Sequence, residues 1–358
     1  MCSSAAVDLE DVTFTDGQEY SNSYETYVNG EFSHEGTYTG ASPFLYGYEC
    51  TMTAQDVSLS QVAGQALMAY SGTYEINGLS LQDIGQSSSA YYDAMYFYVY
   101  VSDTDIWLND VTVSGALEGG ALNVYQGSTS YAVNLYVNGL DIETTDDHAV
   151  SLSGATAEMS NVTITMASGN GVYASDSSIV AEDWSVSGSN GAGYYGSGST
   201  LTVEDMDEDG TVTGLSLDSN GSYGLTDSAG VVHLAQSSIS NNSLSGAYLD
   251  TTSFSGEGNA WSGNGSYGME CSNVTFTDYD GTQDTFSDNG MGYEFGCSDS
   301  WPTSETDTGS DTGGSDTASA DTASTDTAST DTASTDTAST DTGIGVEVPP
   351  DTAIEEIE

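Results

Sequence analysis

Alternating carboxylates give the first candidate for chemistry in this chain. Residues 204–210 read Glu-Asp-Met-Asp-Glu-Asp-Gly, so Asp205, Asp207 and Asp209 alternate ahead of a glycine. Carboxylates at alternate positions can converge on a hard cation, and glycine allows the tight turn that such a loop needs. The twelfth position is Ser216, so the loop lacks the bidentate Glu of a helix-flanked calcium site. We therefore predict a helix-free loop with Ca²⁺ as cofactor; a solvated acidic loop is the alternative.

A shorter acidic segment repeats this pattern in weaker form near the end of the patterned sequence. It contains Asp278 and Asp280, followed by a glycine, with Asp284 close behind. These carboxylates are the second candidate for a cation site, and a solvated loop is again the alternative.

Two adjacent acids and a histidine, Asp146, Asp147 and His148, precede an apolar strand at 149–152. Paired acids beside an imidazole have the residue types of general acid and base catalysis, as in glycoside cleavage. Neighbouring residues of a strand point to opposite faces, so the two carboxylates converge only if they lie in a turn. A non-catalytic surface role for the three residues is the alternative.

Tyrosines alternate with apolar residues along the segment 96–100. In a strand, Tyr96, Tyr98 and Tyr100 share one face, while Phe97 and Val99 lie on the other. An outward row of tyrosines is suited to stacking on neutral sugars or to anchoring a protein partner. The alternative is that these tyrosines serve strand propensity and packing alone.

The charge of the chain restricts its partners. It has no Lys or Arg and 55 Asp and Glu residues, for a formal net charge of −55. The acids are not confined to one end, since 41 lie in residues 1–302 and 14 in 303–358. Their repulsion must be relieved by water, salt or bound cations. Direct binding to nucleic acid or to an anionic membrane is therefore disfavoured, and high solubility is the alternative meaning of the charge.

A repeated short strand must position these candidates. The strand has a four-residue pattern. Its first residue is often Asp, Asn or Gly, its second is apolar, its third is often Ser or Thr, and its fourth is again apolar. Successive final apolar residues are separated by 45, 22, 32, 29, 22, 22, 31, 22, 22 and 25 positions. Five intervals are 22, and three are 22 plus an insertion of seven to ten residues. The final apolar residues are Phe14, Leu59, Leu81, Val113, Ile142, Ile164, Val186, Leu217, Ile239, Trp261 and Phe286.

A second and a third short strand follow within each repeat. Three short strands in 22 residues cannot bury an apolar face alone, but stacked coils about 4.8 Å apart can. The sequence therefore predicts an all-β fold: a right-handed parallel β-helix, or solenoid, of about 11 coils over residues 1–300. Residues 301–358 contain repeated Asp-Thr-Ala-Ser-Thr units with few apolar residues, which predicts a disordered tail.

The repeat units, such as Asp110-Val-Thr-Val113, and turns such as Ser262-Gly-Asn264 resemble the right-handed β-helix repeats of pectin-lyase-like proteins. The Asp/Thr-rich tail resembles that of bacterial surface proteins that carry such helices. The resemblance implies the fold over nearly 300 residues, but this fold hosts lyases, hydrolases, epimerases and adhesins alike. The Asp146–Asp147 pair is faintly similar to the Asp pair of polygalacturonases. Such enzymes bind uronates with basic residues, and this chain has none.

The cysteines test the proposed coil length. Cys271 and Cys297 lie 26 residues apart, about one coil, in similar Tyr- and Glu-containing settings. Equivalent positions on neighbouring coils fall within the Cα separation that a disulfide tolerates. We predict a Cys271–Cys297 disulfide and, less directly, a Cys2–Cys50 disulfide, which imply an oxidising compartment. Buried free thiols are the alternative.

No apolar run approaches the ~20 residues that a membrane span needs. The N-terminal residues lack the features of a signal peptide, yet repeat-like sequence is already present at Val7, so we expect the natural chain to begin upstream. The predicted function is a secreted or surface-displayed bacterial protein that is structural or adhesive, calcium-stabilised, and binds glycans or surface proteins. The alternative is a polysaccharide-active enzyme on the pectin-lyase-like fold.

Overall fold

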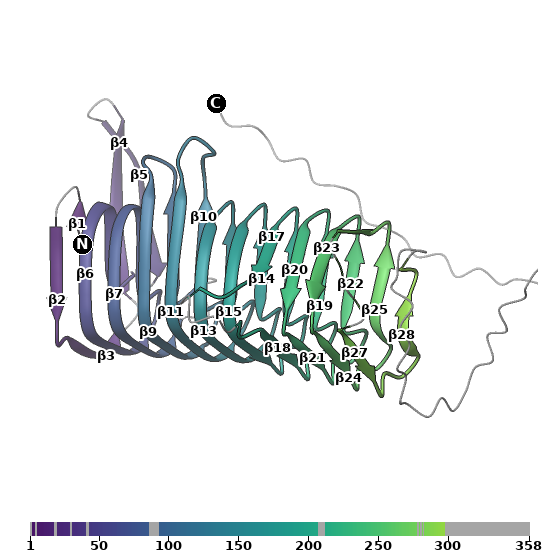
Figure 1. The fold of residues 1–358 in the computed structure, drawn as a ribbon. Coiled ribbons are helices and arrows are strands. Elements are labelled where there is room, and N and C mark those ends of the chain that lie inside the picture. Colours follow the sequence, from purple (N-terminus) through teal and green to yellow (C-terminus); the bar gives the residue numbers. More distant parts are fainter. Residues whose placement is uncertain are drawn as a thin grey trace, which may run out of the picture. The chain divides into compact units, whose positions relative to one another are not determined.

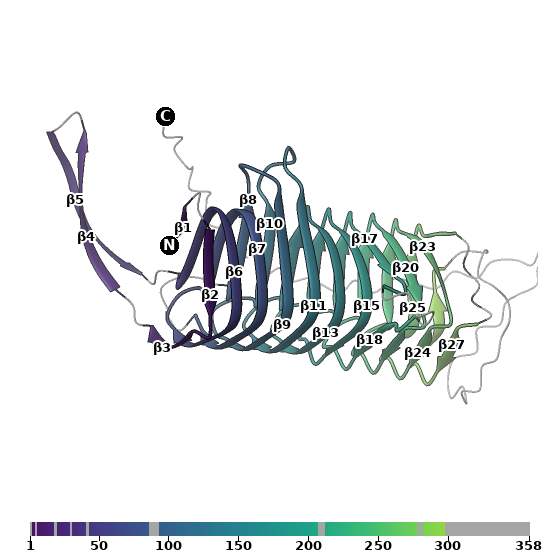
Figure 2. The same cartoon turned by 60° about the vertical axis from the view of Figure 1, so that its left-hand side comes forward.

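The computed structural model contains strands and turns but no helix in the part of the chain that it describes. Twenty-six strands form one sheet whose pairings are parallel, and successive coils stack along one axis (Figures 1 and 2). The predicted all-β, right-handed parallel β-helix is therefore confirmed. The described residues are 2–3, 6–17, 20–28, 31–40, 43–85, 93–206, 212–277, 279, 281 and 283–297.

Each coil has three faces, which we call A, B and C in chain order. One long bent strand covers all three in β6 (Leu45–Val62) and β7 (Leu67–Ile84). Faces B and C share one strand in β9 (Thr104–Ala116), β11 (Val133–Thr145), β13 (Thr156–Ala167) and β15 (Ser178–Ser187).

The remaining strands of the β-helix each belong to one face. Face A has β1 (Cys2–Ser3), β8 (Met95–Val99), β10 (Leu122–Gln126), β12 (Val150–Ser153), β14 (Val172–Ser175), β16 (Tyr194–Ser197), β19 (Leu225–Ser228), β22 (Ala247–Asp250), β25 (Tyr267–Ser272) and β28 (Gly292–Phe295). Face B has β2 (Ala6–Glu10), β17 (Thr200–Val203), β20 (Val231–Ala235), β23 (Ser253–Glu257) and β26 (Thr275–Phe276). Face C has β3 (Thr13–Gly17), β18 (Leu215–Asp218), β21 (Ser238–Ser240), β24 (Ala260–Ser262) and β27 (Thr285–Ser287).

The register of the coils matches the repeat read from the sequence at every step. Phe14 pairs with Leu59, and each later final apolar residue pairs with the next one, as far as Trp261 with Phe286. This gives eleven complete coils, and β28 begins another. The long first interval contains a separate antiparallel hairpin of β4 (Tyr20–Val28) and β5 (Glu31–Gly40).

The recurrent Asp, Asn or Gly has a conformational cause. On the first seven coils this residue forms the corner between faces B and C with a positive φ, for example 53° at Asp110 and 83° at Gly139. A single left-handed residue turns the chain while both flanking segments stay extended, and Asp, Asn and Gly tolerate that conformation best. The same corner is formed by Asp11, Asp56, Gly78, Asn161 and Asp183.

Inside the corners, every second side chain packs into a continuous core. In β12, Val150 and Leu152 are fully buried, while Ser151 and Ser153, which alternate with them, face outward. One polar row also runs through the interior at the turn from face C to face A. We call it the asparagine ladder, because the side chains of its members hydrogen-bond from coil to coil: Asn220, Asn242, Asn264 and Asn289.

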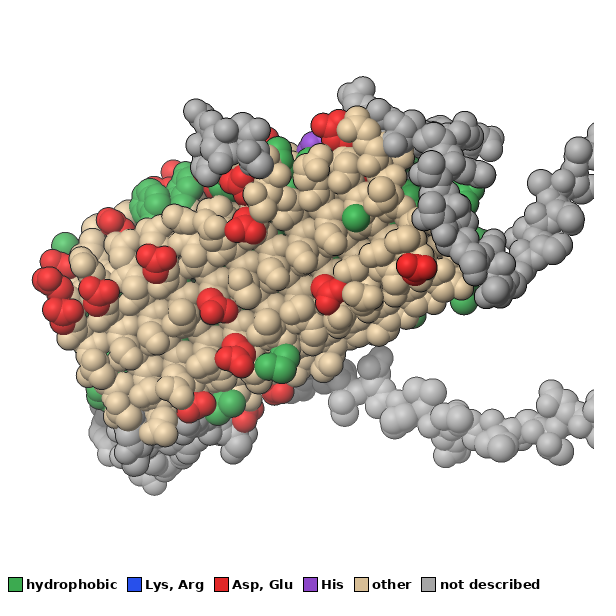
Figure 3. Space-filling model, turned by 60° about the horizontal axis from the view of Figure 1, so that its bottom comes forward, with side chains coloured by type: hydrophobic (Ala, Val, Ile, Leu, Met, Phe, Trp, Pro, Cys, Tyr) green, Lys and Arg blue, Asp and Glu red, His purple; other side chains and the backbone are tan. Residues whose placement is uncertain are grey.

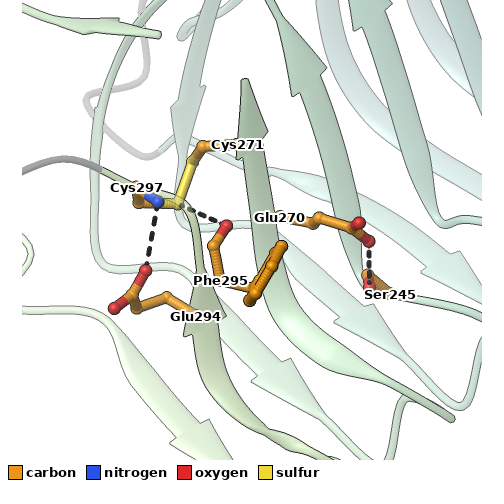
Figure 4. The surroundings of a disulfide bond; sticks show 6 residues. All are labelled: Ser245, Glu270, Cys271, Glu294, Phe295 and Cys297. Atoms are coloured by element: carbon orange, nitrogen blue, oxygen red, sulfur yellow. Dashed lines mark hydrogen bonds between the residues drawn. A yellow bond between two sulfur atoms is a disulfide. The ribbon is translucent and has the colours of Figure 1, made fainter. Parts of the chain in front are cut away.

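The last coil is closed by a disulfide between Cys271 and Cys297, whose Cα atoms are 4.8 Å apart, as the spacing predicts (Figure 4). Beside it, Glu294 accepts a hydrogen bond from the backbone N–H of Cys297 (3.1 Å). Glu294 is in register with the buried Met269, so a carboxylate ends an otherwise apolar inward row. A charge at this place disfavours further stacking.

Two predictions concern parts that the structure does not describe. The side chain of Cys2 lies outside the described residues, so its pairing with the buried Cys50 stays a prediction. Residues 301–358 also lie outside them, and the tail and its boundary near residue 300 stay predictions.

Candidate functional site

Face A carries a row of outward tyrosines near the N-terminal end of the stack. Tyr48, Tyr70, Tyr98 and Tyr125 occupy one position on four successive coils. On the next four coils the same position is a serine: Ser153, Ser175, Ser197 and Ser228. The row therefore changes from aromatic to small hydroxyl side chains along the axis of the β-helix.

Three further tyrosines lie beside this row and widen it. The alternation follows the prediction, since Phe97 and Val99 are fully buried and the tyrosines around them are partly exposed. The ring centroids of Tyr98 and Tyr100 are 5.0 Å apart. We call the group the tyrosine surface: Tyr46, Tyr48, Tyr70, Tyr96, Tyr98, Tyr100 and Tyr125.

The rings of the tyrosine surface pack against one another at several angles. Tyr98 and Tyr125 stack with 5.5 Å between centroids and 5° between planes. Tyr70 stands at 83° to Tyr98, at 5.8 Å. Burial, with the neighbouring tyrosines, raises the pKa of Tyr96 to about 12. Its hydroxyl is therefore neutral in ordinary buffers and can both donate and accept hydrogen bonds.

The candidate acid–base residues lie in the turn from face C to face A, which is the condition for Asp146 and Asp147 to converge. Asp147 Oδ1 lies 3.7 Å from His148 Nδ1, and both side chains are about one-third exposed (36% and 30%). Within the described part of the chain, no hydrogen bond or ion pair joins the Asp146 side chain to either partner.

His148 has a structural role that its sequence context does not reveal. Its Nδ1 accepts the backbone N–H of Asn170 on the next coil (2.9 Å), and its ring stacks on Tyr173 at 5.0 Å. On other coils the side chains at this corner position, Asp93, Asn170 and Ser245, likewise accept a hydrogen bond from a backbone N–H. The donors are the backbone N–H groups of Gly120, Ala192 and Tyr267, respectively.

Because Nδ1 is an acceptor, the neutral imidazole of His148 carries its proton on Nε2 and has no free lone pair there. This tautomer is unsuited to a general base. The catalytic role of Asp146, Asp147 and His148 stays a prediction, and the contacts of His148 do not favour it.

The predicted calcium loop is an insertion between β17 on face B and β18 on face C. Asp205 is described, but Asp207 and Asp209 lie outside the described residues, so the site stays a prediction. In the described ranges, no three His, Cys, Asp or Glu side chains are grouped as they would be around a metal ion.

The weaker candidate, Asp284, is engaged elsewhere. Its carboxylate accepts hydrogen bonds from the backbone and side chain of Asn259, from Trp261 Nε1 (3.0 Å) and from the Tyr279 hydroxyl (2.8 Å). These four donors saturate a buried carboxylate and serve the fold. Asp278 and Asp280 lie outside the described residues.

A hollow of about 570 Å³, which we call the polar groove, lies over β11, β13 and β15 beside the described ends of the insertion. Its chemistry comes mainly from Tyr136, Asn138, Glu158, Glu182 and Asp183. No pattern in the sequence groups these residues, because they are distant in sequence and belong to separate coils. The only signal was the insertion itself, whose Met206 and Thr213 line the groove.

On the face shown in Figure 3, most Asp and Glu side chains stand apart among uncharged polar groups, and a few lie together at one end. Such a surface offers many hydrogen-bond acceptors, and the sequence contains no Lys or Arg to accompany them. Among the described residues, no helix is long and apolar enough to cross a membrane.

No protein-family model and no curated protein matches the chain. Among solved structures, it is similar to a variant of the periplasmic alginate epimerase AlgG (11% identity, TM-score 0.44, 70% of this chain and 67% of that chain). It is also similar to the A-module of the Azotobacter vinelandii mannuronan C-5 epimerase AlgE4 (14%, 0.39, 69% and 81%). A third is a variant of the GH87 α-1,3-glucanase catalytic domain (9%, 0.25, 81% and 61%).

The low identities and TM-scores transfer no activity to this chain. The β-helix itself is established by the strand pairings.

Proposed function

We propose that this chain is an exported polysaccharide-binding protein that holds glycan chains on its tyrosine surface. The observation that carries the proposal is the row of four tyrosines on four successive coils, followed by a serine row. With coils about 4.8 Å apart, the aromatic row repeats regularly along the axis, as the sugars of a polysaccharide do. Aromatic rings with hydroxyl groups suit a ligand that has both apolar ring faces and hydroxyl groups.

The ligand class follows from charge. An anionic polysaccharide would approach a chain of net charge −55 that has no Lys or Arg to pair with its carboxylates. An uncharged polysaccharide meets no such repulsion. Burial raises the pKa of the Tyr70 and Tyr96 hydroxyls, which therefore stay neutral over the physiological range. The Cys271–Cys297 disulfide supports export to an oxidising compartment.

The test is affinity electrophoresis in gels that contain laminarin, mannan or xylan, with polygalacturonate as the anionic comparison. We expect a neutral polysaccharide to retard the protein, and Tyr70→Ser and Tyr98→Ser each to weaken the interaction about twofold to twelvefold, the worth of one aromatic contact. Tyr248→Ser is the matched control, since Tyr248 faces outward on face A of a distant coil. Equal retardation of wild type and both variants would reject the tyrosine surface as the site.

The second candidate is a polysaccharide-active enzyme, and the polar groove favours it. Glu158 and Glu182 line this one hollow, and a pair of carboxyl groups is what glycoside cleavage requires. Chromatography of each polysaccharide after incubation with wild type, Glu158→Gln or Glu182→Gln distinguishes the candidates. Products that form with wild type and not with either variant support the enzyme, and unchanged polysaccharide in every sample rejects it.

A further inference from the structure

The polar groove begins where an aromatic pair ends. On face B, Trp107 and Tyr136 are in register and stack with 5.4 Å between ring centroids and 12° between planes. On the next coil the same position is Glu158. One aromatic ring therefore lines a wall of the groove, and a carboxylate replaces the aromatic side chain on the coil beyond it.

The groove contains polar groups that have no hydrogen-bond partner among the described residues. Among the described residues, no hydrogen bond involves the carboxylates of Glu158 and Asp183 or the amide nitrogen of Asn138, although Asn138 Oδ1 accepts from Asn161 (2.8 Å). Glu182 differs, because its Oε2 accepts the backbone N–H of Met206 (3.0 Å) and so ties the insertion to the floor of the groove. The free groups include both donors and acceptors.

Two ligand classes do not fit these groups. A metal ion needs converging ligands, and no three carboxylate, imidazole or thiolate groups converge among the described residues. An anionic ligand needs cationic partners, and the chain has no Lys or Arg. A ligand with many hydroxyl groups and no charge fits, because hydroxyls donate to carboxylates and accept from amides. The volume of about 570 Å³ is within the range of roughly 300–1,000 Å³ usual for small-molecule sites.

We propose that the polar groove is a binding site for an uncharged oligosaccharide, distinct from the tyrosine surface. The ring of Tyr136 packs against a sugar ring, Glu158 and Asp183 accept hydrogen bonds from its hydroxyls, and Asn138 donates one. The proposal extends the proposed function, since both concern glycans, but it rests on different residues on another face. The two can therefore fail independently.

Trp107 provides a local reporter for this site. It is partly exposed and stacks on Tyr136, whereas Trp184 and Trp261 are 1% and 0% exposed in the core. Ligand binding against Tyr136 is expected to change the fluorescence of Trp107. The variant Trp107→Phe assigns the signal, because it removes the reporter and keeps an aromatic ring beside Tyr136.

The experiment titrates the full chain with laminarihexaose, mannohexaose and xylohexaose, and separately with CaCl₂, while following tryptophan fluorescence. We expect saturable binding of at least one hexasaccharide, weakened about tenfold or more by Glu158→Gln and by Tyr136→Ala. Glu143→Gln is the matched control, since Glu143 is an exposed glutamate on face C and makes no side-chain hydrogen bond among the described residues. Tyr98→Ser is expected to leave this fluorescence change intact.

Three results would overturn the proposal. The first is no fluorescence change with any hexasaccharide at millimolar concentration. The second is binding that Glu158→Gln and Glu143→Gln weaken equally, which would show a general charge effect. The third is a response to CaCl₂ alone that Glu158→Gln abolishes, which would make the groove a cation site. Because Glu158→Gln changes an exposed side chain, it tests the proposal even if Tyr136→Ala does not fold.

Discussion

The asparagine ladder supports a quantitative prediction for Asn242→Ala. Asn242 is 1% exposed, and its side chain makes four hydrogen bonds of 3.0 Å. Its Oδ1 accepts the backbone and side-chain N–H groups of Asn220, and its Nδ2 donates to Leu217 O and to Asn264 Oδ1. Alanine removes all four and leaves the buried backbone N–H of Asn220 without this acceptor, while Asn220 Nδ2 keeps only a long hydrogen bond to Val186 O (3.5 Å).

At about 1 kcal/mol for each intramolecular hydrogen bond, the loss is about 4 kcal/mol of unfolding free energy. Stranded buried donors add to it, while alanine avoids the entropy cost of fixing an amide side chain. The end of the ladder is less buried, and the Asn289 side chain makes three hydrogen bonds, so Asn289→Ala is expected to cost about 3 kcal/mol or less. The predicted order is therefore a larger loss inside the ladder than at its end.

The measurement is urea unfolding followed by circular dichroism, with the free energy obtained by linear extrapolation. Asn190→Ala is the control, because Asn190 is exposed, has no positive φ, and makes no side-chain hydrogen bond in the described part of the chain. An Asn242→Ala variant within about 1 kcal/mol of the Asn190→Ala control would refute the view that the ladder holds the coils together.

The sequence was sufficient for the fold because one conformational requirement recurs on the early coils. A left-handed residue must bend the chain between faces B and C, and Asp110 and Asn161 meet that need with side chains that leave a visible pattern. The role of His148 was not visible, since its partner is a backbone N–H on the next coil. The polar groove was hidden for the same reason, because Tyr136 and Glu158 become neighbours only through the stacking.

Three further outcomes are expected. Burial raises the pKa of Asp227, outweighing the hydrogen bonds from Thr252 and Gly230, so the folded state binds this proton more tightly than the unfolded state does. The stability that the Asp227 carboxyl group contributes is greatest below its pKa in the unfolded state. It is lost as the pH rises through its pKa in the folded state. The gain in melting temperature from Asp227→Asn should thus be larger at pH ~7 than at pH ~4; an equal gain at both would contradict this. Reducing the Cys271–Cys297 disulfide, which spans 26 residues, should lower the free energy of unfolding by up to about 3.5 kcal/mol. It should speed hydrogen exchange in β25 and β28 but not in β12, and an equal increase in all three strands would contradict a local stabilising role. For the proposed calcium loop, CaCl₂ should raise the melting temperature of wild type but not of Asp207→Ala, and equal responses would remove the site.

A chain without Lys or Arg must stabilise its carboxylates by other means, and Asp218 illustrates how. Burial alone would raise the pKa of Asp218, but hydrogen bonds from Ser240, Asn241 and Ser219 together lower it. Two of these three donors come from the next coil. The stacking that forms the core therefore also stabilises the charged carboxylate of Asp218 by hydrogen bonds. The surface that results offers carboxylates, amides and hydroxyls without cations. Such a surface is complementary to two classes of partner, cationic groups and uncharged sugars, and the exposed tyrosines favour the second.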